Sequence, residues 1–114
     1  MTAEKFIAFI GKLLEKTKSG EIKWIRCSLN PYDEIWASST KSFSCVAGTM
    51  KVDMLSDEDS DSMRFYIEYD RRLPVTTWIP ESDEERQISL RLVNYVYNLF
   101  PNLEKSIDDF LNNF

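Results

Sequence analysis

Few residues of this 114-residue chain are of the types that usually carry out acid–base or metal chemistry. The chain contains no histidine and only two cysteines, Cys27 and Cys45. Without histidine, neither a Ser–His–Asp nor a Cys–His arrangement can form within one chain. Two thiolates are also too few for the usual ligand set of a structural zinc site. We therefore predict no catalytic residue, no metal site and no cofactor, and a role other than that of an enzyme.

The two cysteines lie in segments that we predict to be strands, so the sequence allows a disulfide between Cys27 and Cys45. Free Cys is among the most buried residue types, and disulfides are rare in cytosolic proteins. Two free thiols, buried or half-buried, are therefore the expected state.

An acidic segment has the ligand spacing of a calcium-binding loop. Asp57, Asp59 and Asp61 occupy positions 1, 3 and 5 of such a loop, and Glu68 falls at position 12. However, Ser62 stands where these loops need glycine, and no helix is expected on either side. We therefore expect a solvated acidic turn, with calcium binding as the alternative.

Two further carboxylates, Glu68 and Asp70, are expected on one face of a strand. A pair of carboxylates is what glycoside hydrolysis requires. Two acids on a polar strand face are too common to indicate that activity. We expect them to lie on a solvent-facing surface of the sheet.

The charge of the chain is acidic and unevenly distributed. The net charge is −5, and the sequence pI is about 4.7. Residues 1–56 carry eight Lys and Arg against six Asp and Glu, whereas residues 57–114 carry six against thirteen. Nucleic-acid binders usually have a basic excess, so we predict no nucleic-acid partner. The asymmetry favours charge-steered association with another protein.

Hydropathy excludes a membrane span, because no apolar run approaches about 18 residues. The apolar stretch 6–10 is preceded by Glu4 and followed by Lys12, and no small-residue cleavage site follows it. This pattern is typical of a helix rather than a signal peptide. We therefore expect a cytoplasmic protein without a membrane partner.

Three segments have the periodicity of amphipathic helices. Residues 3–18 follow a plausible N-cap, Thr2, and end before Ser19-Gly20. Residues 82–99 begin with a capping box formed by Ser82 and Glu85. Apolar residues then repeat at helical spacing from Leu103 to the chain end.

The middle of the chain alternates apolar and polar residues as strands do. Residues 21–29, 63–70 and 75–79 are predicted as strands, and residues 42–55 as one long strand with a bulge or bend at Gly48. Asn30-Pro31 marks a turn, and residues 32–40 fit either a helical turn or a loop. The expected fold is a single α+β domain covering residues 1–114. It has an N-terminal helix, a four-stranded antiparallel meander and two C-terminal helices packed on one face of the sheet.

The segment Leu14–Trp24 contains the pattern T-x-x-G-x-I-x-W, and residues 66–70 read Tyr-Ile-Glu-Tyr-Asp. Both stretches resemble a group of small bacterial α+β domains, with a first helix, this pattern entering a strand meander, and C-terminal helices. Residues 29–42 and 56–62 are longer here than that pattern expects. The resemblance implies the fold only, because the group has no known activity and so no functional residue can be carried over.

The surface residues that do not fit a single core are the candidates for binding. Among the aromatic residues these are Trp36, Tyr66 and Tyr97, and exposed Tyr and Trp are enriched at protein interfaces. Leu90 and Tyr97 lie off the buried stripe of their helix. The last helix is expected to cover them, and the alternative is that they form a dimer or partner patch. A stripe of lysines on the first helix, including Lys12 and Lys16 beside Lys5, could contact an anionic partner.

From these features we expect a non-enzymatic protein–protein interaction or regulatory module, whose partner is another protein or a second copy of itself. The alternative is a small-ligand binding domain, with an aromatic-lined pocket between sheet and helices that presents polar groups such as Arg64, Tyr66 and Glu68. A third reading is an acidic decoy that occupies a nucleic-acid-binding protein through residues 57–61 and 83–85.

Overall fold

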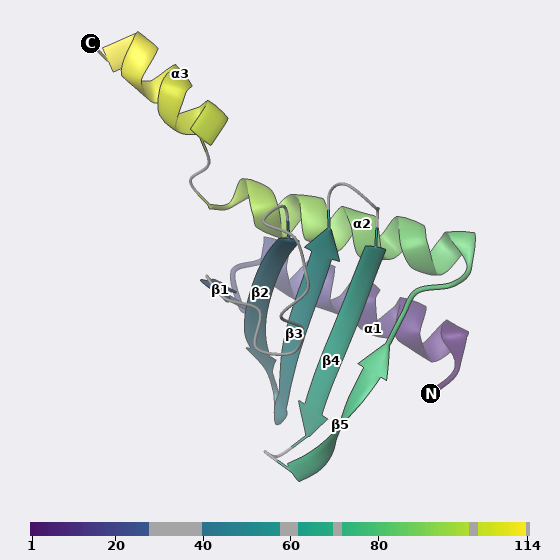
Figure 1. The fold of residues 1–114 in the computed structure, drawn as a ribbon. Coiled ribbons are helices and arrows are strands. Elements are labelled where there is room, and N and C mark those ends of the chain that lie inside the picture. The colour runs from purple at the N-terminus through teal and green to yellow at the C-terminus, as the bar shows by residue number, and fades with distance from the viewer. Residues whose placement is uncertain (28–39, 58–61, 70–71, 101–102, 114) are drawn as a thin grey trace.

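The computed structural model describes residues 1–27, 40–57, 62–69, 72–100 and 103–113 (Figure 1). They form an α+β fold, as the sequence predicts. The elements, in chain order, are α1 (Ala3–Lys18), β1 (Trp24–Cys27), β2 (Thr40–Ala47), β3 (Met50–Asp57), β4 (Ser62–Tyr69), β5 (Arg72–Trp78), α2 (Asp83–Asn98) and α3 (Leu103–Asn113). The predicted turn at Asn30-Pro31 and the ambiguous stretch 32–39 lie outside the described residues.

The strands form one antiparallel sheet with the order β1-β2-β3-β4-β5. The prediction of four strands is wrong, because residues 42–55 do not form one strand. They belong to β2 and β3, which are joined by a tight turn at Gly48 and Thr49. Gly48 has a φ of 62°, in the left-handed region that glycine adopts without steric cost.

This hairpin also changes which residues of β2 face the core. In its register Cys45 pairs with Val52 and Ala47 with Met50, so odd-numbered residues of β2 share a face with even-numbered residues of β3. Cys45 is therefore 4% exposed, whereas Val46, on the other face of the sheet, is 69% exposed. The alternation continues through the turn in the sequence, so period alone does not reveal that the chain reverses.

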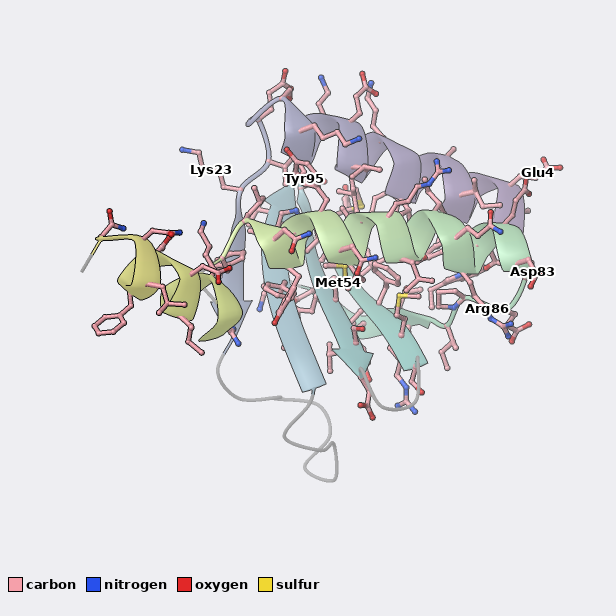
Figure 2. All side chains as sticks on the ribbon, turned by 90° about the horizontal axis from the view of Figure 1, so that it is seen from above. Glu4, Lys23, Met54, Asp83, Arg86 and Tyr95 are labelled. Atoms are coloured by element: carbon pink, nitrogen blue, oxygen red, sulfur yellow. The ribbon has the colours of Figure 1, made fainter. Side chains whose placement is uncertain are left out.

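Helices α1 and α2 lie side by side across one face of the sheet (Figures 1 and 2). Phe6 of α1 packs against two rings of the sheet: the ring centroids lie 5.4 Å from Phe65, edge to face, and 5.1 Å from Trp78, stacked. Leu92 and Val96 of α2 are fully buried beside them. The core therefore lies between the two helices and the sheet.

Local sequence signals set the ends of both packed helices. The Thr2 side chain accepts a hydrogen bond from the Lys5 amide at 3.2 Å, and Gly20 follows α1 with a φ of 83°. In α2, the capping box of Ser82 and Glu85 is present in both directions. These predictions are confirmed because each cap depends only on residues within one helical turn.

The expected packing of both C-terminal helices on the sheet holds only for α2. Helix α3 projects beyond the C-terminal end of α2 and does not lie over the sheet (Figure 1). Leu99, the C-cap residue of α2, is 53% exposed. None of the helices in the described part of the chain is long and apolar enough to cross a membrane.

Candidate protein-interaction surface

Helix α3 separates its apolar and polar residues onto different sides. At 100° per residue, its four apolar residues fall within an arc of about 100°. Lys105, Asp108, Asp109 and Asn112 lie outside that arc. We call Ile107, Phe110 and Leu111 the α3 stripe. Their exposed fractions are 48%, 62% and 69%, so the chain presents three large apolar side chains to solvent on one helix.

The α3 stripe has the spacing of a docking helix. Ile107, Phe110 and Leu111 stand at positions i, i+3 and i+4, which are the anchor positions of an amphipathic helix that binds in a groove. Figure 2 shows α3 extending away from the layer of α1 and α2. The helix is therefore placed where another molecule can reach it.

A hollow of about 600 Å³ lies beside the N-terminal half of α2, at the end of that helix away from α3. The start of β4, the segment after β5 and the first half of α2 form it, and we call it the α2 hollow. It is lined by Ser62, Met63, Arg64, Ile79, Pro80, Arg86 and Leu90. Leu90 is 40% exposed and Ile79 51% exposed, so the hollow has an apolar wall open to solvent. The prediction that the last helix covers Leu90 is wrong, because α3 projects beyond the far end of α2.

Two arginines bring positive charge to the α2 hollow. The Arg86 guanidinium lies 4.0 Å from the Asp83 carboxylate, and the Arg86 side chain is 58% exposed. Such an exposed ion pair contributes little to stability. Arg64, at the start of β4, also lines this hollow. The hollow therefore combines apolar contact area with groups that favour an anionic partner.

A smaller hollow of about 400 Å³ contains Trp78, Glu81 and Glu85. The Glu85 carboxylate accepts hydrogen bonds from Trp78 Nε1 at 2.8 Å and from the Ser82 amide at 3.2 Å. The bond from Trp78, followed by those from Ser82, lowers the pKa of Glu85. These contacts join β5 to the start of α2, which gives Glu85 a structural role.

The predicted binding aromatics are not brought together. Tyr66 lies on β4 in the row formed by Ser44, Asp53 and Thr77, on the face of the sheet opposite the helices. Tyr97 lies on α2, half-buried against the core. Trp36 lies outside the described residues.

The predicted lysine surface is partly neutralised by neighbouring carboxylates. Lys12 Nζ lies 3.4 Å from Glu15 Oε2, and Lys16 Nζ lies 2.9 Å from Glu21 Oε2. The hydrogen bond to Glu21 raises the pKa of Lys16. Each of the two lysines already has a partner within its own chain.

The two predicted calcium ligands that the structure describes, Asp57 and Glu68, do not lie close together. Asp57 pairs with Ser62 at the start of β4, whereas Glu68 lies six residues further along the same strand, about 20 Å away. Asp59, Asp61 and Asp70 lie outside the described residues. Within the described ranges, no group of three or more Cys, Asp or Glu side chains is arranged to hold a metal ion.

The cysteines are also too far apart for a disulfide in this register. Cys27 pairs with Ser42 and Cys45 with Trp24, three steps apart along the β1–β2 ladder, or about 10 Å. A disulfide needs a Cα separation of about 4.4–6.8 Å. Cys45 is a free thiol, and its burial raises its pKa to about 12, so it is not a reactive nucleophile.

The geometry thus defines a small α+β protein with two helices over one face of its sheet and one exposed amphipathic helix. Comparison with known proteins adds no relative, since no family model, no curated protein and no solved structure matches the chain. The α3 stripe was not among our predicted binding residues. Two residues of the α2 hollow appeared in alternative predictions, Leu90 in a dimer or partner patch and Arg64 in a ligand pocket. The apolar repeat of residues 103–114 did reveal the stripe, but we assigned it to the core.

Proposed function

We propose that this chain is a small non-enzymatic interaction module that docks onto another protein through the α3 stripe. The observation that carries the proposal is the exposure of Ile107, Phe110 and Leu111 on one side of a projecting helix. Covering apolar surface contributes roughly 25 cal/mol per Å². A partner with an apolar groove would therefore gain affinity from these three side chains.

The length of α3 supports the same conclusion. An isolated helix of 11 residues is marginal in water, and most helices in proteins are stabilised by packing of their apolar side. Binding would supply that packing. Helix α3 should therefore become more ordered when the partner binds.

The charge of α3 favours a protein partner over a membrane surface. Surface-seeking amphipathic helices are rich in Lys and Arg on their polar side, because cell membranes carry anionic lipids. Residues 103–113 contain Glu104, Asp108 and Asp109 against Lys105. An acidic helix of this kind would be repelled by such a surface.

The alternative, a small-ligand domain with an aromatic-lined pocket between sheet and helices, has less support. The Phe6 ring contacts both Phe65 and Trp78 there, and these three side chains belong to the packed core or lie against it. Tyr66 and Glu68 do not line the α2 hollow, although Arg64 does. We also propose a cytoplasmic location, where a free thiol such as Cys45 stays reduced.

The test is affinity capture from lysate of the source cells with the tagged chain and two variants. Leu111→Ser removes an anchor of the α3 stripe, and Asn112→Ser is the matched control on the polar side of the same helix. A captured protein is identified by mass spectrometry, purified and titrated against each variant. We expect Leu111→Ser to weaken binding by about tenfold or more and Asn112→Ser to leave it unchanged.

Two outcomes would contradict the proposal. One is a partner that binds Leu111→Ser as tightly as the original chain. The other is cosedimentation with vesicles of anionic phospholipid that depends on Leu111, which would make α3 a membrane-surface helix.

A further inference from the structure

We infer that the partner of α3 is a second copy of this chain, whose α2 hollow receives the α3 stripe. The inference rests on the proposed docking role of α3 and names its partner. It is carried by the chemical match between two surfaces of the same molecule. The first is exposed at the C-terminal helix, and the second lies at the first half of α2.

The apolar parts of the two surfaces match. The α3 stripe offers Ile107, Phe110 and Leu111, and the α2 hollow offers Ile79, Leu90 and neighbouring apolar side chains. A volume of about 600 Å³ is within the range of sites that enclose a small organic ligand. Side chains from one turn of a helix have a similar bulk. Docking would cover exposed apolar area on both copies at once.

The charges of the two surfaces are opposite. Asp108 lies next to the α3 stripe on the helix, whereas Arg64 and Arg86 line the α2 hollow. The Arg86 side chain is exposed and contacts Asp83 only at 4.0 Å, so it can move toward an incoming carboxylate at little cost. Complementary charges at the rim of an apolar contact set its orientation and speed association.

The α2 hollow of one copy is out of reach of its own α3 as the chain is arranged. Leu90 and Leu99 are separated by nine residues of α2, about 13 Å along the helix axis. Beyond Leu99, α3 continues away from the layer of α1 and α2 (Figure 2). The stripe that enters the hollow must therefore come from another molecule.

Two copies can satisfy both contacts at once. Each chain has one stripe and one hollow, so a twofold axis would pair the stripe of each copy with the hollow of the other. The two stripe–hollow contacts would then be identical. The resulting dimer would leave neither stripe exposed.

The first measurement is sedimentation equilibrium of the purified chain from low micromolar to near-millimolar concentration. We expect a reversible monomer–dimer equilibrium. Leu111→Asp in the stripe and Arg86→Glu in the hollow should each weaken dimerisation by about tenfold or more. Val46→Ser, which removes an equally exposed apolar side chain from the sheet, is the control and should dimerise like the original chain.

Two complementation experiments distinguish this pairing from other dimers. A mixture of the Leu111→Asp and Arg86→Glu chains retains one intact stripe and one intact hollow, so it should form a heterodimer although each variant alone is largely monomeric. The double variant Arg86→Glu/Asp108→Arg restores opposite charges and should recover part of the lost affinity. Circular dichroism and thermal melting check that every variant is folded.

A chain that remains monomeric at every concentration would overturn the inference, as would a dimer unaffected by both Leu111→Asp and Arg86→Glu. The affinity-capture experiment tests the proposed function independently of this inference. If the chain is monomeric but captures a different protein through Leu111, α3 is a docking helix with another partner. If it is monomeric and captures nothing through α3, both proposals fail.

Discussion

Helices α2 and α3 have the same kind of amphipathic sequence but opposite environments. In α2, Leu92 and Val96 are fully buried against the sheet and α1. In α3, Phe110 and Leu111 are 62% and 69% exposed. An apolar stripe thus indicates which side of a helix seeks a partner, whether that partner comes from the same chain or from another molecule.

The difference comes from what surrounds each helix. Helix α2 is joined to β5 through the Trp78–Glu85 hydrogen bond and lies beside α1, so its apolar side is held over the sheet. Helix α3 follows the end of α2, where Phe100 contacts Phe43 at a centroid distance of 5.3 Å. Beyond that contact the described chain leaves the sheet.

The largest effect should come from removing one leucine from each helix. Leu92→Ala should lower the free energy of unfolding by about 2–5 kcal/mol, because it leaves a cavity in the core. Leu111→Ala should change it by less than about 0.5 kcal/mol at a protein concentration too low for association. Urea denaturation measures both. Equal losses would mean that α3 is packed in the isolated chain.

A smaller loss should follow from breaking the buried polar contact between α1 and β1. Trp24 Nε1 donates to Thr17 Oγ1 at 2.9 Å, and Thr17 Oγ1 donates to the Leu13 carbonyl at 2.6 Å. Thr17→Val keeps the shape but leaves the indole N–H without an acceptor, at a cost of about 1–3 kcal/mol. Thr17→Ser retains the hydroxyl and is the control. Indistinguishable stabilities of the two variants would show that this hydrogen bond contributes nothing.

Two glycines of the packed region should respond with opposite signs. A Cβ at either Gly11 or Gly48 meets no atom within 4 Å, so only backbone conformation distinguishes them. Gly11→Ala in α1 should stabilise by about 0.5–1 kcal/mol, because alanine loses less entropy in a helix. Gly48→Ala at a φ of 62° should destabilise by about 1 kcal/mol. A stabilising Gly48→Ala would argue against the β2–β3 turn.

The smallest change at neutral pH is expected for Glu85→Gln, since glutamine also satisfies a capping box. The folded protein lowers the pKa of Glu85, so the charged carboxylate stabilises the fold above the unfolded value of about 4.3. That contribution is lost as the pH falls through the lower, folded pKa. The stability advantage of the original chain over Glu85→Gln should therefore shrink below about pH 4.5, measured by thermal melting. A difference independent of pH would contradict this assignment.

Much of the architecture was predictable from short stretches of sequence. The bounds of α1, the capping box of α2 and strand β4 follow from caps and periodicities that involve neighbouring residues only. The β2–β3 hairpin was not predicted, because the alternation runs through Gly48 without interruption. The exposed stripe of α3 was visible in the sequence as an apolar repeat, but its exposure was not predicted.

The sequence by itself determined where helices form and which of their sides are apolar, because helical hydrogen bonds and caps connect residues three or four positions apart. Only the tertiary structure decided which of those sides are covered. Coverage depends on residues distant in the sequence, such as Phe6 against Trp78 or Phe43 against Phe100. Leu92 and Leu111 are alike as residues, and their difference in exposure arises entirely from what the folded chain places against them.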